Sequence, residues 1–152
     1  MKLGEALSKL KKEKSRLARL ILLRKQNVFV EEGKSTKFDP NELSRDIDNK
    51  IDEIRKLKLK IQETNIRTTI AGTDLTLAEA IIKVGDIRSR LSQLSVLFEK
   101  KERFLYRDKD EKELAAQVDE LEVEDTIEKL EIEKAQLDNK IQMANWTTQL
   151  AD

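Results

Sequence analysis

Two glutamates in the C-terminal half of the chain, Glu128 and Glu131, have a spacing that places two carboxylates on one face of a helix. Carboxylate oxygens are the ligands that magnesium prefers in proteins, so such a pair could help to bind a divalent cation. The chain contains 30 Asp and Glu residues, however, and this spacing is expected by chance among so many. No companion pair stands in the required arrangement on a second predicted helix. We therefore expect no metal site and no catalytic residue.

The absence of two residue types limits the chemistry further. The sequence contains neither His nor Cys. It therefore excludes a disulfide framework, a zinc site built from imidazole or thiolate, and a histidine-based catalytic triad. We expect that the protein is not an enzyme and has no cofactor, and the sequence identifies no small-molecule ligand.

Two asparagines, Asn65 and Asn145, occur in similar segments that are followed by Thr68 and Thr148. In one interpretation these side chains cap the C-terminal ends of two helices by bonding to the last free carbonyl groups. In the other, Asn65 and Asn145 form a polar pair in a shared pocket, where each buried amide would need hydrogen-bond partners.

Two arginines, Arg16 and Arg90, also occupy matching places, each after a serine and before a leucine. We expect them to flank the core and to pair with carboxylates across a helix interface. The alternative is an anion site built from the two guanidinium groups, since arginine binds phosphate in a fork geometry.

These candidates lie on segments whose apolar residues recur every three or four positions, the pattern of an amphipathic helix. It predicts four helices, over residues 3–26, 40–67, 76–105 and 120–148. Asp39 and Asp119 are the predicted N-caps of the second and fourth helices. The connections, residues 27–39 and 106–118, are longer than usual for a bundle, and we expect both at the same end of it.

The sequence also contains an internal repeat. Residues 3–24 aligned with 77–98 give nine identities in 22 positions, and residues 39–68 aligned with 119–148 give ten in 30. We therefore predict a single helical domain, residues 1–152, that contains repeat 1 at about 3–69 and repeat 2 at about 76–149. The predicted fold is all-α, an antiparallel four-helix bundle of coiled-coil-like character built from two duplicated helical hairpins.

Charge is balanced overall but unevenly distributed. The chain has 30 basic and 30 acidic residues and no net charge. Residues 1–25 contain nine basic and two acidic side chains, whereas residues 108–138 contain 13 acidic and four basic. We expect the basic first helix to lie against the acidic last helix, within one molecule or between two. The alternative, a nucleic-acid surface, lacks aromatic residues for stacking, so we expect no nucleic-acid partner.

The first helix has a wider apolar surface than one buried face requires, which predicts that the protein forms a homo-oligomer. No apolar run is long enough for a signal segment or a membrane-spanning helix, and we expect a cytoplasmic protein with no stable membrane insertion. The residues that we expect in the oligomer interface are Leu20, Leu22, Leu23, Phe29, Phe98 and Phe104.

Three segments resemble the septicolysin-like family of small, uncharacterised bacterial all-helical proteins. They are Met1–Leu7, Gly72–Ala80 and Ile141–Thr148, although Ala144 departs from the Thr expected at that position. The resemblance implies a bacterial helical protein without established chemistry, and we interpret the chain as a self-associating structural or interaction module. One alternative is the membrane activity that the family label implies. The other is a magnesium-dependent, all-helical nucleotide pyrophosphatase.

Overall fold

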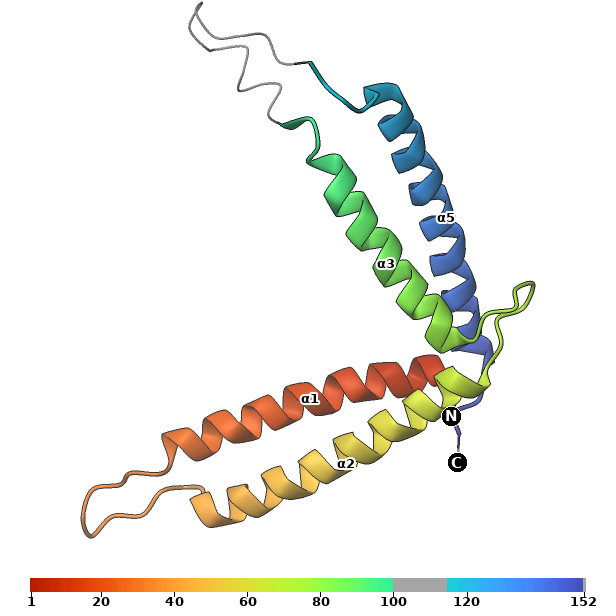
Figure 1. Ribbon diagram of the computed structural model, residues 1–152. Coiled ribbons are helices and arrows are strands. Elements are labelled where there is room, and N and C mark those ends of the chain that lie inside the picture. Colours follow the sequence, from red (N-terminus) through yellow and green to blue (C-terminus); the bar gives the residue numbers. More distant parts are fainter. Residues whose placement is uncertain (100–114, 152) are drawn as a thin grey trace, which may run out of the picture.

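The computed structural model describes residues 1–99 and 115–151, and the helices in these ranges form two antiparallel hairpins (Figure 1). The first hairpin consists of α1 (Leu3–Gln26) and α2 (Pro40–Arg67). The second consists of α3 (Leu77–Ser95) and α5 (Glu120–Thr147). The described residues form no β-sheet; they contain two isolated β-bridges, Lys2 with Gln149 and Thr69 with Thr76. The predicted all-α fold, built from helical hairpins, is confirmed.

The helices begin where the sequence predicted. Asp39 Oδ1 accepts a hydrogen bond from the Asn41 N–H at 2.8 Å, with Pro40 at the first helical position. Asp119 Oδ1 accepts from the N–H groups of Leu121 at 2.8 Å and Glu122 at 3.3 Å. In each case the carboxylate satisfies backbone donors that have no partner within the helix.

Helix α3 ends ten residues before the predicted end at residue 105. The Leu97 N–H donates to the Leu94 carbonyl at 3.2 Å, and the Glu99 N–H donates to the Val96 carbonyl at 3.4 Å. Such bonds between residues three apart tighten the last turns of a helix. The Ser95 hydroxyl also donates to the Ser92 carbonyl at 3.1 Å, which competes with the backbone pattern. Residues 100–105 of the predicted helix lie outside the described residues.

Each hairpin is held together by one row of buried side chains from each helix. In the second hairpin this row is apolar except for Asn145, and its residues recur at intervals of three, four or seven positions, which keep them on one helix face. In the first hairpin the same spacing includes one acidic residue, Glu13. The buried members of the rows include Leu3, Ala6, Glu13, Leu43, Ile47, Ile54 and Ile61 in the first hairpin and Leu77, Ala80, Val84, Ile87, Val123, Leu130, Leu137 and Ile141 in the second.

The two hairpins meet at one end and diverge from there as two arms, with both chain termini at the junction (Figure 1). At the junction a common core combines the first turns of α1 and α3 with the last turns of α2 and α5. Its buried residues are Leu3, Ala6, Ile61, Ile70, Leu77, Ala80, Val84, Leu137 and Ile141. Farther out, the apolar row of each helix packs against the other helix of the same hairpin. No apolar row then remains to pack against the other hairpin. The four helices therefore share a core at the junction rather than along their full length.

Backbone hydrogen bonds at the junction repeat at positions that the sequence alignment pairs. The Leu3 N–H donates to the Thr148 carbonyl at 3.0 Å, and the Leu77 N–H donates to the Thr68 carbonyl at 2.8 Å. In the same way, the Leu150 N–H donates to the Met1 carbonyl and the Ile70 N–H donates to the Leu75 carbonyl, both at 2.9 Å. The segment that links the two hairpins thus has the same local geometry as the two chain ends. In the link, Gly72 has φ of +71°, a left-handed conformation that suits glycine.

One close contact at the junction depends on a glycine. A Cβ atom added to Gly4 would lie 3.0 Å from two ring carbons of Trp146 and 3.2 Å from the Asn145 carbonyl oxygen. The Trp146 ring therefore lies directly on the backbone of the first turn of α1. The aligned positions of the other repeat hold a different pair, Ala78 and Ile66.

The described parts of the two long connections are not close together. Residues 27–39 lie at the far end of the first arm (Figure 1). The far ends of α3 and α5 lie at the far end of the second arm (Figure 1). Because the arms diverge, residues 27–39 are separated in space from residues 115–118, unlike the arrangement predicted from sequence. Of the predicted second connection, residues 106–114 lie outside the described residues.

Candidate functional site

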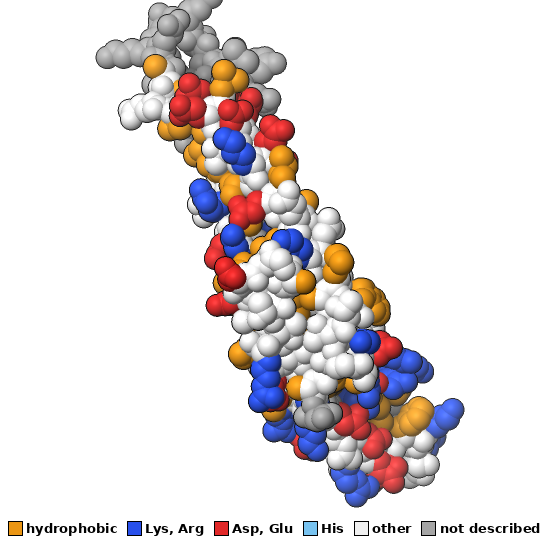
Figure 2. Space-filling model, turned by 90° about the vertical axis from the view of Figure 1, so that its right-hand side faces the viewer, with side chains coloured by type: hydrophobic (Ala, Val, Ile, Leu, Met, Phe, Trp, Pro, Cys, Tyr) orange, Lys and Arg blue, Asp and Glu red, His pale blue; other side chains and the backbone are white. Residues whose placement is uncertain are grey.

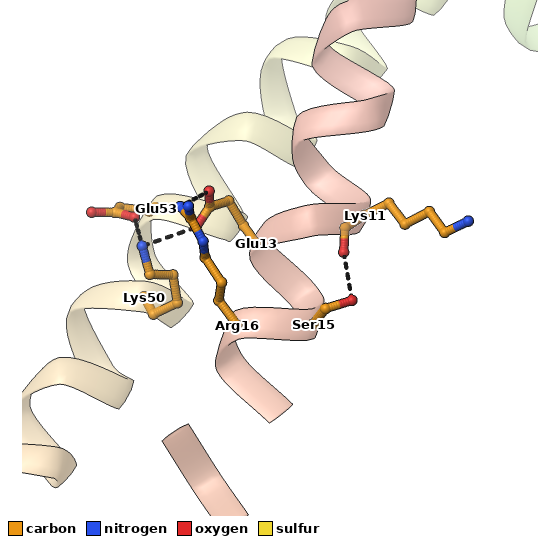
Figure 3. Close-up of polar contacts among 6 residues, drawn as sticks. All are labelled: Lys11, Glu13, Ser15, Arg16, Lys50 and Glu53. Carbon is orange, nitrogen blue, oxygen red and sulfur yellow. Dashed lines mark hydrogen bonds and ion pairs between the residues drawn. The ribbon is translucent and has the colours of Figure 1, made fainter. Parts of the chain in front are cut away.

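An ion cluster around one buried carboxylate, that of Glu13, occupies the middle of the first hairpin (Figure 3). Glu13 is only 6% exposed, and its Oε1 accepts a hydrogen bond from Arg16 Nη1 at 2.7 Å. Its Oε2 lies 3.0 Å from Lys50 Nζ, an ion pair between α1 and α2. Lys50 Nζ also lies 2.5 Å from Glu53 Oε2. Two carboxylates are thus paired with two cations.

The contacts shift the pKa values of both central groups. The contact with Lys50 lowers the pKa of Glu13 most; burial opposes this shift, and the positive charge of Arg16 adds to it. The pKa of Lys50 is raised, first by its hydrogen bond to Glu53 and then by that to Glu13. Both groups are therefore charged at neutral pH, and each charge stabilises the other.

The aligned positions of the second hairpin show what this cluster replaces. Glu13 corresponds to Ile87 and Lys50 corresponds to Leu130, and both of these apolar side chains are buried. The cluster is therefore one charged layer in a row that is otherwise apolar, and its charges are already paired. Such layers fix the register of helix packing at the expense of stability. Sequence analysis missed it, although a charged residue on each of two apolar faces was the available signal.

The carboxylates considered as magnesium ligands lie on an open helix face. Glu128 and Glu131 are both exposed on α5. Among residues 1–99 and 115–151, no three or more Asp or Glu side chains are grouped so that they could hold a metal ion.

The predicted asparagine and threonine sites lie at the junction. Asn145 is buried and Asn65 is half-buried, and neither amide side chain has a hydrogen bond to another described residue. The Thr68 and Thr148 N–H groups donate instead to the carbonyls of residues 64 and 144, which closes the last turns of α2 and α5. The structure does not pair the two amides. Thr64, which sequence analysis did not select, holds the C-terminal segment: its hydroxyl accepts from the Ala151 N–H at 2.9 Å.

The two predicted anion-binding arginines are on different arms. Arg16 is on α1 and pairs with Glu13, as described above. Arg90 is on α3, is exposed and has no ion pair within the described part of the chain. Because α1 and α3 diverge from the junction, the structure does not bring the two guanidinium groups together (Figure 1).

The described residues of the predicted oligomer interface divide into half-buried and exposed groups. Leu20, Leu23 and Phe98 are half-buried, and Phe104 lies outside the described residues. Leu22 is 54% exposed and Phe29 is 89% exposed. They lie toward the far end of the first arm, together with three further exposed apolar residues, and we call these five residues the arm-end patch: Ile21, Leu22, Val28, Phe29 and Val30.

The two arms have opposite net charges. Residues 1–67 contain 18 basic and 11 acidic residues, a net charge of +7. Residues 76–151 contain 12 basic and 17 acidic residues, a net charge of −5. Acidic side chains gather near the far end of the second arm, with hydrophobic side chains exposed among them (Figure 2). Helix α1 packs mainly on α2 and meets α5 only near the junction, so most of the basic helix does not lie against the acidic one.

A solved structure shows the same architecture. A functionally unknown conserved protein from Corynebacterium diphtheriae is 26% identical in sequence, and the similarity covers 99% of each chain with a TM-score of 0.85. No curated protein matches the sequence. No helix in the described residues is both long and apolar enough to cross a membrane.

The predicted resemblance to septicolysin-like proteins is wrong. Residues 9–150 match the model of a different family, described as a family of unknown function, DUF6847. Neither this description nor that of the Corynebacterium diphtheriae protein points to a cytolysin. Since the match covers nearly all of the sequence, the chain belongs to this family of unknown function.

Proposed function

We propose that this protein is a structural or interaction module that works by self-association. The observation that supports the proposal most directly is the arm-end patch, in which Phe29 is 89% exposed. An arm of two helices can bury only the faces that the helices turn toward each other. Apolar residues on other faces remain in water until a partner covers them, and covering them is favourable.

The charge distribution supports the same proposal. A net charge of +7 on one arm and −5 on the other disfavours contact between like arms and favours contact between unlike arms. Because the arms of one molecule diverge, unlike arms can meet along their length only between molecules. We expect the module to act in the cytoplasm and without a nucleic-acid partner.

Substitution of Leu22 by Glu tests the proposal, because a charge in the arm-end patch opposes its burial. We expect the wild-type protein to be an oligomer and Leu22→Glu to shift it toward monomer, by light scattering after size exclusion and by sedimentation velocity. The matched control is Ser15→Glu, which places the same charge on an exposed position of α1 outside the patch. A wild-type protein that is monomeric up to millimolar concentration would refute self-association.

The proposal assigns no catalytic chemistry. We expect no magnesium-dependent release of phosphate or pyrophosphate from nucleoside triphosphates. The opposite result would be a nucleotide hydrolysis that requires magnesium and is lost in the variant Glu128→Gln/Glu131→Gln. That outcome would refute the proposal of a module without catalytic activity and would support a nucleotide pyrophosphatase instead.

A further inference from the structure

One face of α2, beside its buried row, carries apolar and basic side chains together. Ile51 and Leu59 are exposed on this face with Arg55 and Lys58 between them. They border an open groove of about 550 Å³ on the first arm. Its lining residues are Leu17, Ile51, Ile54, Arg55, Lys58, Leu59 and Gln62. We call the exposed residues Ile51, Arg55, Lys58, Leu59 and Gln62 the basic stripe.

Helix α5 carries a matching face of opposite charge. Leu121 is 71% exposed and Ile132 is 51% exposed, and the exposed carboxylates Asp125 and Glu128 lie between them. At 100° per residue these four positions fall within a narrow arc, on the side of α5 away from its buried row of Val123, Leu130 and Leu137. We call these four residues the acidic stripe.

The two stripes agree in length and in the spacing of their residues. Positions 51, 55, 58 and 62 have the same spacing as positions 121, 125, 128 and 132. Each stripe extends about 16 Å at 1.5 Å per residue. In the acidic stripe the two charges lie between Leu121 and Ile132, whereas in the basic stripe they lie between Ile51 and Gln62, with Leu59 beside Lys58. Apolar residues and opposite charges can therefore meet at the same time, with Arg55 exchanging its partner Asp52 for a carboxylate of α5.

We propose that the basic stripe of one molecule docks on the acidic stripe of a second copy, with apolar side chains of α5 entering the groove on the first arm. This inference rests on the proposed self-association and names the surfaces that carry it. A second copy is the occupant that the charges favour, because every molecule brings both stripes and the diverging arms keep them apart within one molecule.

Two stripes per molecule allow two types of assembly. If two molecules exchange both contacts, the assembly closes as a symmetric dimer. If each contact is made with a different neighbour, the contact is heterologous and generates a ring or an open chain. The proposed contact is the same in both cases, and the measured mass distinguishes them.

Charge reversal on each stripe separately tests the contact. The first variant is Arg55→Glu/Lys58→Glu and the second is Asp125→Lys/Glu128→Lys. All four side chains are exposed, so the substitutions leave the buried rows unchanged. In each variant alone, like charges face each other at every stripe contact, and we expect association at least about tenfold weaker than wild type.

A mixture of the two variants is the decisive measurement. In a mixed pair, the reversed basic stripe of one variant meets the reversed acidic stripe of the other, and the remaining two stripes have their natural charges. We therefore expect the mixture to recover association, and a single chain with all four substitutions to self-associate. Circular dichroism and thermal unfolding of each variant show whether it is folded.

The outcomes separate this inference from the proposed function. If the wild type associates and both folded variants associate equally well, the stripes are not the contact, but self-association stands. If both variants weaken association and the mixture does not restore it, the pairing of stripes is refuted. If the wild type is monomeric, both proposals fail. Recovery in the mixture, reduced by raising the salt concentration, supports the inference.

Discussion

At the scale of single residues, the ion cluster of the first hairpin shows how a paired charge can occupy a buried row. Glu13 would be costly at 6% exposure if it were unpaired, but Arg16 and Lys50 both neutralise it. The second hairpin has Ile87 and Leu130 at the aligned positions and packs without a charge there. We interpret the cluster as a layer that specifies register in the first hairpin and that stabilises the hairpin no more than an apolar layer would, and this interpretation can be tested.

The double substitution Glu13→Ile/Lys50→Leu copies the apolar layer of the second hairpin into the first. We expect its melting temperature to equal or exceed that of the wild type, because a well-packed apolar pair often stabilises more than a buried ion pair. The single variant Lys50→Leu should melt at a lower temperature, since Glu13 then keeps only Arg16. Thermal unfolding by circular dichroism measures all three. A double variant that melts well below the single variant would contradict the interpretation.

The same cluster predicts a dependence of stability on pH. The pKa of Glu13 is lowered in the folded protein from its ordinary value of 4.5, so the folded state binds this proton less readily than the unfolded chain. The stabilisation is then fully present above pH 4.5 and is lost as the pH falls through the lowered pKa. We expect the urea midpoint of the wild type to fall more between pH 5 and pH 3 than that of Glu13→Ile/Lys50→Leu. Equal falls of the two midpoints over this pH range would contradict the prediction.

The contact between Gly4 and Trp146 gives a second test at this scale. Gly4→Ala places a methyl group 3.0 Å from the indole ring and should lower the free energy of unfolding by about 1–3 kcal/mol, as overpacking does. Trp146→Ile with Gly4→Ala recreates the Ala78 and Ile66 pair of the other repeat. In a urea-unfolding double-mutant cycle, we expect the double variant to lose less than the sum of the single losses. Strict additivity would show that the ring moves away freely.

At the scale of helices, the sequence predicted the boundaries where a side chain marks them. The predicted ranges 3–26, 40–67 and 120–148 agree closely with α1, α2 and α5, because Asp39 and Asp119 cap the second and last of these. The end of α3 was not predictable in the same way. The apolar spacing continues past Ser95 to Phe98, and periodicity does not report the local hydrogen bonds that close the helix.

The two aspartate caps differ in the number of donors that they satisfy, which predicts different effects on their helices. Asp119 accepts from two N–H groups and Asp39 from one. Replacing either by Ala should cost about 1 kcal/mol in the free energy of unfolding, with the greater loss for Asp119→Ala. Urea unfolding measures the loss. Hydrogen exchange should also become faster in the first turn of α5, and protection there equal to that of the wild type would contradict the role of the cap.

At the scale of the whole molecule, apolar spacing indicates which face of a helix is buried but not what covers it. It therefore predicted the hairpins and the existence of a shared core, but it could not show that the core ends after the first turns of α1 and α3. The same limit applies to the candidate site. Leu22 and Phe29 were selected from sequence, whereas the two charged stripes emerged only once the buried rows were known.

The repeated hydrogen bonds of the junction lead to a prediction for a circularly permuted chain. Residues 71–74 connect Ile70 to Leu75 in the link between the hairpins, and the aligned positions at the chain ends are Leu150 and Met1. Since both sites have the same backbone bonds, a copy of Ala71–Asp74 should be able to join Leu150 to Met1. The new ends would then lie between Gly72 and Thr73. We expect this permutant to fold with wild-type helix content and to melt within a few degrees of the wild type.

The control for this experiment uses the same joining segment but opens the chain between Ile54 and Arg55, inside α2. Because Ile54 belongs to the buried row of the first hairpin, this cut interrupts a helix whose packing holds the arm together. We expect the control permutant to lose helix content while the first permutant retains it, both measured by circular dichroism. If both permutants unfold, the chain ends and the link are not interchangeable, and the equivalence of the two halves of the junction is limited to their hydrogen bonds. If only the control unfolds, the junction tolerates an opening at either of its two equivalent sites, because the shared core and not the covalent link holds the hairpins together.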